Sequence, residues 1–450
     1  MNQYLCLHSL TTYTAVLLVR DANGRPKELP FGNAVRTLLT AQTERRADRM
    51  HLRERANRGE GPLAQYSFGT RTREWALLAT RELVALGWDE TSARTMAKEA
   101  LAGLGLNFGN KDSNSDLTKV LIFAPERAGV DIATVLHDHR DQMQQWLALV
   151  TEEHGKAERN MKRAKNRKKS QSHDAEADTD EQVNIPALPT EVKQKLLTAF
   201  SPRDSIDIAL YGRFLAEIAE SPNVDGAIQT MGSFTVGPAC VVDDFYCSAD
   251  DAKLARRASA LDVFDEPGAG MTGYQSLFSG TFYGHSVIDR VKLRRTLAAS
   301  TDWNEQQVEA AAQAAEAAFI DAFCNAVPAA KANTTAAPGT LPKLVLAFSS
   351  NRPHNYAGCF EQAIEETSDS PSASIQAARR LLAQHHMIIR KCRIEPGRVL
   401  TYDLATEALL NELRSAGQLA CGEVDTLDDF IKSDAHPAAE DRVKRVEVSV

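Results

Sequence analysis

The stretch FGNAVRTLLTAQTERRADRMHLRERANR, which runs from Phe31 to Arg58, decides how the first part of the chain folds. If it continues as a helix from about Thr40, its basic and polar side chains recur every three or four residues and therefore share one face. That face carries Gln42, Arg45, Arg46, Arg49 and Arg53. The spacing predicts a basic stripe along the helix.

The remaining positions of this helix predict how the stripe is mounted. Glu44 and Asp48 are expected on its flank. Ala41, Ala47 and Met50 supply apolar positions that could seat the helix on a core.

The stripe admits two interpretations. The turn Phe31-Gly32-Asn33 leads into the stripe. The stripe suits a phosphate backbone better than a small substrate, because guanidinium groups bind phosphate through paired donors. A solvated amphipathic helix has the same pattern. The residues of this stretch alone leave both interpretations open.

The composition is that of a globular protein and limits its partners. The chain has 450 residues, enough for one to three domains with a sizeable core. Its net charge of −8 argues against indiscriminate binding to polyanions. Any contact with nucleic acid must therefore come from a local basic patch.

The cysteines and the apolar runs indicate a cytoplasmic protein. The seven cysteines form no C-x-x-C pair and no regular framework, so we expect reduced thiols. The sequence MNQYLCLHSLTTYTAVLLVR at the start lacks the pattern of a signal peptide, and no apolar run approaches the roughly 20 residues that span a bilayer. Neither secretion nor a membrane anchor is expected.

Strand and helix patterns alternate along the chain. Strands are predicted over 4–10 and 13–19 (one strand or a pair), 119–125, 205–214, 275–288, 343–348 and 387–394. Helices are predicted within 71–105 and 130–151, from 190 onward, and over 305–326 and 375–384. The irregular stretch 239–273 and the strand after it would form a long hairpin with a loose tip. The pattern predicts an α+β fold with helical insertions.

Residues 156–181 differ from the rest in composition. Lys and Arg dominate 156–170, Asp and Glu dominate 174–181, and almost nothing apolar stands in either half. Such a segment buries too little surface to offset its ordering entropy, so we expect a flexible loop. It could be a solvated linker or make a transient contact with a phosphate backbone.

No cofactor or metal site is predicted. His137-Asp138-His139 and His385-His386 lack helical i, i+4 spacing and a third ligand nearby. The GAGMTG run at 268–273 lacks the Lys-Ser/Thr ending of a phosphate loop and opens no helix. Asp243 and Asp244 could bind a hard cation or be an ordinary solvated pair.

Several blocks, in order, resemble one family. FGNAVRTLLTAQTERRADR (31–49) is similar to the segment of the type I-E CRISPR backbone proteins, the CasC family, in which a Phe-Gly turn leads into a Ser/Thr-x-Gln-x-x-Lys/Arg-Arg-Ala-x-Arg helix. IDIALYGRF (206–214) with NVDGAI (223–228), GYQSLFSGTFYGHSVI (273–288) and VPAAKANTTAA (327–337) resemble the D-I-A-L-x-G-R-M, V-D-G-A, Q-x-F-S-S-G-x-F-Y and V-P-x-A-K-Q-x-T-x-A-A blocks. Together the blocks cover most of the chain outside 150–185.

The resemblance implies a function and a set of partners. Members of the family polymerise along the spacer of a CRISPR RNA within the Cascade surveillance complex, whose other subunits are of the CasA, CasB, CasD and CasE types. The complex presents the guide to target DNA in antiviral defence, and the backbone subunit itself is no enzyme. The partners implied are CRISPR RNA, target DNA, other copies of this chain in a helical filament and those subunits, with no membrane.

The family fold resembles a hand, which assigns parts of this chain. An RRM/ferredoxin-like palm would hold 1–58, 196–238 and 274–450, a helical finger insertion 59–195, and a β-hairpin thumb 239–273. The thumb of the family reaches the next subunit and kinks the guide at regular intervals.

The resemblance also carries over site residues by motif. RNA contacts are implied at Lys27, Thr40, Gln42, Thr43, Arg45, Arg46, Arg49, Arg213, Phe214, Met271 and Lys331. Phe214 stands where the family has Met and would stack on or wedge between bases, as would Met271. Weaker contacts with target DNA are implied at Lys162, Arg163, Lys165, Arg167, Lys168 and Lys169.

Two departures and two other functions accompany the resemblance. The basic run after Phe-Gly is reduced to Ala34-Val35-Arg36, and Ala332 replaces the Gln after A-K, which puts contacts there in doubt. A relative of the type III backbone proteins would cleave RNA with Asp243 or Asp244. A generic helical RNA-binding module would bind one copy per RNA.

Overall fold

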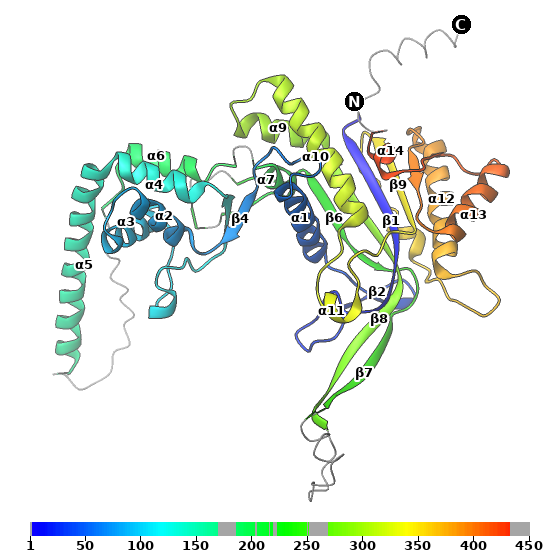
Figure 1. Ribbon diagram of the computed structural model, residues 1–450, viewed down its shortest axis with the longest axis horizontal. Coiled ribbons are helices and arrows are strands. Elements are labelled where there is room, and N and C mark those ends of the chain that lie inside the picture. Colours follow the sequence, from blue (N-terminus) through cyan, green and yellow to red (C-terminus); the bar gives the residue numbers. More distant parts are fainter. Residues whose placement is uncertain are drawn as a thin grey trace, which may run out of the picture. The chain divides into compact units, whose positions relative to one another are not determined.

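The computed structural model describes residues 2–169, 186–202, 205–215, 217–218, 223–249, 251 and 269–432 (Figure 1). The chain forms two compact units. Unit 1 comprises 1–65, 227–295 and 305–450, and unit 2 comprises 66–226 and 296–304. Residues 196–226, expected in the palm, thus belong to the same unit as the predicted finger.

Unit 1 is built on a seven-stranded sheet in the order β11-β10-β9-β1-β8-β6, with β7 paired to β8. The strands are β1 Tyr4–Val16, β6 Ile228–Thr235, β7 Cys240–Ala249, β8 Ala269–Asp289, β9 Leu344–Ser350, β10 Arg398–Leu400 and β11 Gly422–Glu423. β1 is a single strand rather than a pair, and it lies antiparallel between β8 and β9. The strands predicted over 275–288 and 343–348 are confirmed.

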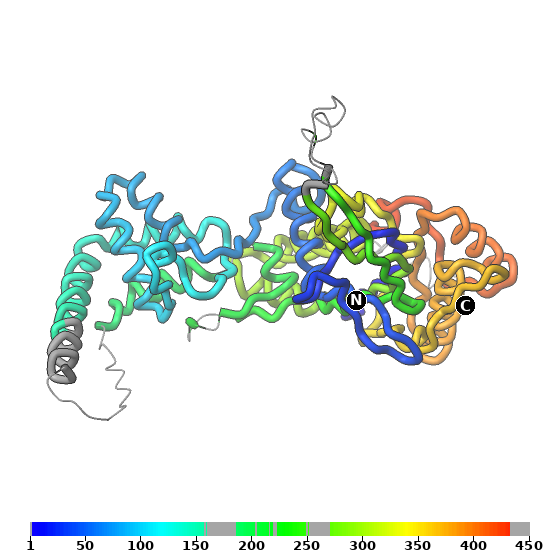
Figure 2. The backbone as a smooth tube through the Cα atoms, turned by 90° about the horizontal axis from the view of Figure 1, so that it is seen from below, coloured from blue at the N-terminus to red at the C-terminus, as the bar shows by residue number. Residues whose placement is uncertain are grey.

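Helices cover both faces of this sheet. They are α1 Ala41–Asn57, α9 Arg290–Ser300 (which continues into unit 2), α10 Glu305–Asn325, α11 Ala332–Thr335, α12 Ala373–Cys392, α13 Leu404–Ser415 and α14 Leu427–Lys432. Since side chains alternate along a strand, Ser9 and Thr11 of β1 face the α1 side while Cys6 and Leu10 pack in the core that includes Leu381 of α12. α1 and α10 lie side by side (Figure 1), and α12 packs with α13 (Figures 1 and 2).

Two predictions in unit 1, one of a helix and one of a strand, have different outcomes. The helix over 305–326 is confirmed as α10. The strand predicted over 387–394 is wrong, because α12 continues to Cys392. Its buried residues Ala377, Ala378, Leu381, Leu382 and His385 recur at helical spacing, which outweighs the β-branched run that follows them.

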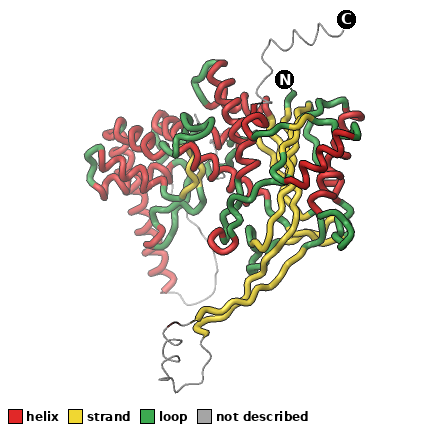
Figure 3. The backbone as a smooth tube through the Cα atoms, turned by 45° about the vertical axis from the view of Figure 1, so that its right-hand side comes forward, coloured by secondary structure: helices red, strands yellow, loops and turns green. Residues whose placement is uncertain are grey.

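The long hairpin predicted around 239–288 is present. β7 pairs with β8 from Cys240↔Ser279 to Ala249↔Ala269, and the two strands extend away from the helices of unit 1 (Figures 1 and 3). The predicted loose tip falls on 252–268, outside the described residues. Of the GAGMTG run, 269–273 lies in β8, so it opens no helix.

Unit 2 packs helices around Trp75, Leu101, Ile132, Trp146 and Phe200. Its elements are β4 Gly69–Thr72, β5 Ile122–Pro125, α2 Trp75–Ala85, α3 Glu90–Gly103, η1 Asp112–Asn114, α4 Ala128–Asp138, α5 Arg140–Lys169, α6 Thr190–Ala199 and α7 Ile206–Tyr211. Asp89 caps α3 by accepting from the Ser92 amide. The helices predicted within 71–105 and 130–151 and from 190 are confirmed, as is a strand within 119–125.

Two predictions in unit 2 need correction. The strand over 205–214 is a helix, α7, whose six residues are all buried, so the sequence shows no polar face that would reveal the helical period. The Asp207 carboxylate accepts from the Gly69 amide at 2.7 Å and fixes this helix to β4. The flexible loop expected over 156–181 is helical as far as Lys169, because α5 continues that far, and 170–181 lies outside the described residues.

No helix in the described residues is both long enough and apolar enough to cross a bilayer. The two units together have the predicted α+β class. Unit 1 contains a mixed sheet, and unit 2 consists mainly of packed helices. The detailed likeness of unit 1 to an RRM remains a prediction.

Candidate nucleic-acid interface

The helix α1 begins where the sequence predicts. Thr40 is its N-cap in extended conformation, and its hydroxyl shares a 2.9 Å hydrogen bond with that of Thr43. The turn before it is tightly determined: Gly32 has φ +62°, and a Cβ there would lie 1.7 Å from the Glu361 carbonyl oxygen. The Asn33 side chain accepts from the Ala363 amide at 2.7 Å. Gly32 and Asn33 thus fix the entry to α1.

The inward face of α1 differs from the prediction. Asp48 and Leu52 are buried, and the Glu44 carboxylate accepts from the hydroxyl and the amide of Ser233. Met50, expected to seat the helix, is 37% exposed. Glu44 and Asp48 are therefore wrongly assigned to the flank: they lie i, i+4 on the side that faces the sheet.

The outward face of α1 forms one wall of an open groove of about 670 Å³, which we call the α1 groove. From α1 it is lined by Gln42, Thr43, Arg46, Ala47, Met50, His51 and Glu54. The facing residues are Leu18, the segment 325–330, Pro338 and Gly339. The groove brings together two sequence blocks, 31–49 and 327–337, that lie almost 300 residues apart.

The predicted basic stripe is divided between two directions. Arg46 lines the α1 groove with Gln42 and Thr43. Arg45 instead reaches the sheet, where its Nη1 donates to the Ile228 carbonyl oxygen at 3.4 Å, and its charge lowers the pKa of Asp48 against the opposing effect of burial. Arg49 is half-buried. The α1 groove is therefore less basic than the sequence predicts.

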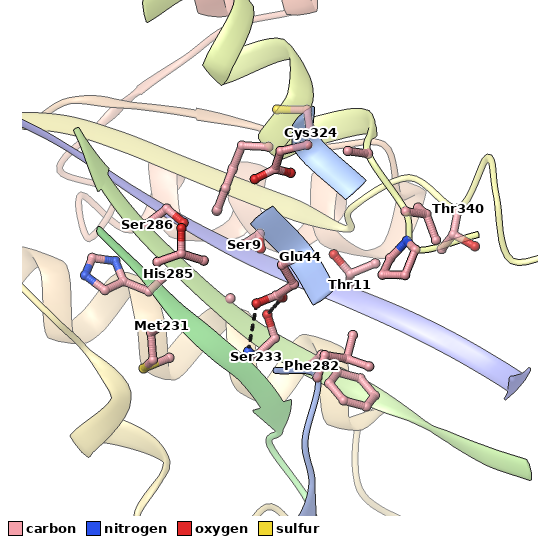
Figure 4. Close-up of a pocket in the computed structure, with 18 of the residues that line it drawn as sticks. Ser9, Thr11, Glu44, Met231, Ser233, Phe282, His285, Ser286, Cys324 and Thr340 are labelled. Atoms are coloured by element: carbon pink, nitrogen blue, oxygen red, sulfur yellow. Dashed lines mark hydrogen bonds between the residues drawn. The ribbon is translucent and has the colours of Figure 1, made fainter. Parts of the chain in front are cut away.

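A small cavity of about 60 Å³ lies beneath α1 (Figure 4). Ser9, Thr11, Glu44, Ser233 and His285 are among its lining residues. Burial raises the pKa of Glu44 to about 8, although the hydrogen bond from Ser233 acts in the opposite sense.

Asp48 lines the same cavity, and burial raises its pKa to about 7. Burial thus favours the protonated form of both carboxyl groups. This limits the negative charge beneath α1.

A second cleft of about 410 Å³, the hairpin cleft, holds Lys331. Its other lining residues are Leu17, Arg20, Asn23, Gly24, Arg25, Asp243, Tyr246, Tyr274, Gln275 and Ser276. Sequence reasoning missed Arg20, Arg25 and the two tyrosines, because only the fold brings the turn after β1 to the hairpin. Lys27 is half-buried and lies outside both lining sets.

The hairpin exposes several large apolar side chains. Met271 is 61% exposed, Tyr274 76% and Phe245 54%, and the rings of Phe245 and Tyr274 are 5.1 Å apart between centroids. Exposed aromatic rings offer stacking surfaces to bases. Met271 is thus accessible, as the predicted wedge requires.

Of the two residues in unit 2 that were predicted to contact RNA, one is exposed and one is not. Phe214 is 75% exposed. Arg213 is buried, donates to the Phe123 carbonyl oxygen at 3.3 Å, and has its pKa lowered by burial to about 10. Its RNA contact remains a prediction, and its observed role is inside unit 2. The residues Lys162, Arg163, Lys165, Arg167, Lys168 and Lys169 lie along α5, and their DNA contact is untested.

The histidine and aspartate pairs form no metal centre. His137 Nδ1 accepts from the Trp88 indole at 3.1 Å, and His385 is buried between the Tyr356 hydroxyl and the Pro396 carbonyl oxygen. Within the described residues, no group of three or more His, Cys, Asp or Glu is arranged to hold a metal ion. Asp243 and Asp244 are neighbours on β7 and therefore project from opposite faces.

A seven-stranded α+β unit with a projecting hairpin, joined to a helical unit, defines the structural class of this protein. Among solved structures, a chain of "CRISPR RNA-guided surveillance complex, pre-nicking" has this fold with a TM-score of 0.69 and 23% identity, covering 96% of this chain and 99% of that one. A chain of "CRISPR RNA-guided surveillance complex" gives 0.62 and 20%, with coverage of 96% and 99%. No curated protein matches the chain.

The family follows from the sequence itself. The model of the CT1975-like protein family (Cas_CT1975) matches residues 5–419, and the chain belongs to that family. The resemblance to a CRISPR-associated family is thereby confirmed. Its finer assignment to type I-E stays a prediction.

Proposed function

We propose that the chain is a guide-RNA-binding backbone subunit of a Cascade-type CRISPR surveillance complex, and that the α1 groove holds the sugar-phosphate backbone of the guide. The observation that carries this is the convergence of two distant blocks on one groove, with Gln42, Thr43 and Arg46 facing the 325–330 segment. Membership of a Cas family and the fold shared with chains of RNA-guided complexes support it.

The chemistry of the groove suits a contact that ignores sequence. An amide, a hydroxyl and a guanidinium can all donate to phosphate oxygens or to ribose hydroxyls. Arg46 supplies a planar fork of donors that matches phosphate geometry. A backbone subunit must hold every guide alike, and such contacts do so.

The finer assignments rest on the same proposal. Unit 1 would be the RRM-like palm, the β7–β8 hairpin the thumb that reaches the next copy, and the complex type I-E in the cytoplasm. CRISPR RNA, target DNA, further copies of the chain and subunits of the CasA, CasB, CasD and CasE types would be its partners. The exposed rings of Phe245 and Tyr274 favour a role for the hairpin in contacts outside its own chain.

The proposed subunit is not an enzyme. The rival function, RNA cleavage with Asp243 or Asp244, needs carboxylates that converge on one cation. These two project from opposite faces of β7, and the Asp243 carboxylate accepts from the Ser276 hydroxyl. Metal-dependent cuts in bound target RNA, lost on Asp243→Ala or Asp244→Ala, would establish cleavage instead.

Replacing Arg46 with alanine is expected to weaken RNA binding about tenfold, because one phosphate contact is lost. For the same reason, the slope of log K against the logarithm of the salt concentration should become shallower by about one. The measurement is a titration of unstructured RNAs of guide length at several salt concentrations. The loss should be equal for RNAs of different sequence.

A matched control removes an arginine elsewhere in unit 1. Arg390, exposed in the last turn of α12, lines neither the α1 groove nor the hairpin cleft. Arg390→Ala should keep the wild-type affinity to within about twofold. Equal losses in both variants would reduce the effect to net charge and overturn the assignment of the groove.

Assembly is tested by the native mass of the particle. Co-expressed with a CRISPR RNA and the other subunits, the chain should be recovered in several copies per RNA. One copy per RNA would identify a generic RNA-binding module.

A further inference from the structure

The carboxylate of Asp321 joins both walls of the α1 groove. Asp321 lies in α10 and is 3% exposed. Its Oδ2 accepts from His51 Nε2 at 2.9 Å and from Arg55 Nη1 at 2.6 Å, both on α1. Its Oδ1 accepts from the Asn325 amide group at 2.9 Å, where α10 ends and the opposite wall begins.

Two of these three partners line the groove themselves. His51 belongs to the α1 wall and Asn325 to the facing segment. Because a carboxylate only accepts, His51 Nε2 must carry the proton that it donates, which fixes the orientation of the ring. The single carboxylate thus sets the position of a side chain on each side of the groove.

The segment after α10 depends on this anchor. Ala326 still donates to the Ala322 carbonyl oxygen at 2.7 Å, but Pro328 has no amide to continue the helix. The chain then reaches Lys331 in left-handed conformation with φ +57°. The Asn325–Asp321 hydrogen bond ties the last residue of α10 to the turn of helix before it, at the point where the segment leaves α10.

The pKa of Asp321 is lowered, which keeps its carboxyl group ionised. Burial would raise the pKa of Asp321, but the hydrogen bond and charge of His51 and the charge of Arg55 outweigh burial and hold the pKa below its usual value. The group is ionised at neutral pH, and both of its oxygens are engaged.

We propose that Asp321 is a positioning residue for RNA: through His51, Arg55 and Asn325 it holds the two walls of the α1 groove at the separation that a guide backbone requires. This inference rests on the proposed function and adds a determinant outside the RNA contacts themselves. The positioning role and the effect of charge alone predict opposite changes in RNA binding when the carboxylate is removed, and this difference provides the test. Removal of a negative charge near the groove should strengthen RNA binding by charge alone.

Asp321→Asn is nearly isosteric and makes the protein more positive by one. The new amide has one accepting oxygen and no charge, so the ion pair with Arg55 is lost, and the hydrogen bonds with both α1 and Asn325 persist only if the Asn325 amide turns over. We expect RNA binding about tenfold weaker and a lower salt dependence. The matched control, Glu54→Gln, removes one charge from the groove wall and leaves the carboxylate of Asp321 in place. It should bind RNA two- to threefold more tightly.

A third variant separates position from charge. Asn325→Ala keeps the net charge and removes only the connection to the segment, and it should weaken RNA binding about threefold. In the RNA-free protein, Asp321→Asn and Asn325→Ala should both speed hydrogen exchange at the amides of 332–336, which follow the segment, while Glu54→Gln should not.

The outcomes are distinct. Tighter RNA binding by Asp321→Asn, or unchanged exchange at 332–336 in both anchor variants, would overturn the positioning role. If the wild-type protein binds no RNA, the proposed function fails, and hydrogen exchange in the RNA-free protein still decides whether Asp321 anchors the segment.

Discussion

Replacement of Arg36 by methionine is expected to lower the free energy of unfolding of unit 1 by about 4 kcal/mol. The Arg36 side chain is fully buried. Its guanidinium donates to the carbonyl oxygens of Val236 at 2.7 Å, Thr235 at 3.0 Å and Phe360 at 2.9 Å. Methionine fills similar space but donates no hydrogen bond, so these oxygens lose the guanidinium, and only that of Val236 is known to keep a donor, the Ile364 amide at 2.9 Å.

The arrangement of the segments explains the size of this effect. Arg36 lies in β3 (Ala34–Thr37), which pairs with β2 (Glu28–Phe31), and it joins that hairpin to the end of β6 and to the 3₁₀ turn η2 (Ala357–Phe360). Arg36→Lys should also destabilise unit 1, because an ammonium group cannot reach oxygens on several segments at once. Arg25→Met, at an exposed position, should cost less than about 0.5 kcal/mol.

The distribution of tryptophan allows the two units to be measured separately. All four tryptophans, Trp75, Trp88, Trp146 and Trp303, belong to unit 2. Hydrogen exchange at β1 and β9 reports on unit 1, and tryptophan fluorescence reports on unit 2. A loss below 1 kcal/mol at β1 in Arg36→Met would contradict the structural role of the guanidinium.

Replacement of Glu44 by glutamine is expected to flatten the pH dependence of unfolding between pH 6.5 and 8. The folded-state pKa of Glu44 is raised to about 8 by burial, above the usual value of 4.5. Between these values the folded state keeps a proton that the unfolded state has released, so the wild type loses stability as pH rises. From pH 6.5 to 8, this loss amounts to about 2 kcal/mol.

The chosen pH window isolates the carboxyl groups. Burial lowers the pKa of His285 and of His385 to about 4, so these histidines reduce stability only as pH falls below about 6.5. Asp48, with its pKa raised to about 7, acts in the same direction as Glu44 and persists in the variant. Glu44→Gln should therefore retain a smaller slope.

The measurement is urea unfolding followed by circular dichroism at pH 6.5, 7.2 and 8.0. Glutamine preserves both hydrogen bonds with Ser233, since its oxygen accepts from the amide and its NH₂ group donates to the hydroxyl. Glu54→Gln, exposed on the same helix, should keep the wild-type slope because water solvates that carboxyl in both states. Equal slopes for the wild type and Glu44→Gln would show that Glu44 is ionised in the folded protein.

The helices with one polar and one apolar face could be predicted from sequence, and those without a polar face could not. α1 and α10 begin within a residue of their predicted starts, because caps and periodicity are local properties. α7 is buried on every side, so its apolar run resembles a core strand. The C-terminal part of α12 carries a β-branched run, which the helical spacing of the buried residues before it outweighs.

For the candidate site, the sequence identifies residue types but not their directions. Gln42, Thr43 and Arg46 line one groove, whereas Arg45 turns to the sheet. Arg20, Arg25, Tyr246 and Tyr274 come together in the hairpin cleft from distant parts of the chain, and nothing local signals their convergence.

The sequence by itself determined the position of the helix after FGNAVRTLLT, the order of the blocks and hence the family, because these depend on neighbouring residues. Only the tertiary structure decided what each residue of that stretch does. Gly32 avoids the backbone at Glu361, Arg36 is a buried connector rather than a remnant of an RNA-binding run, and Glu44 and Asp48 face the sheet. The physical reason is that burial and hydrogen-bond partners come from β6, η2 and α10, which lie hundreds of residues away.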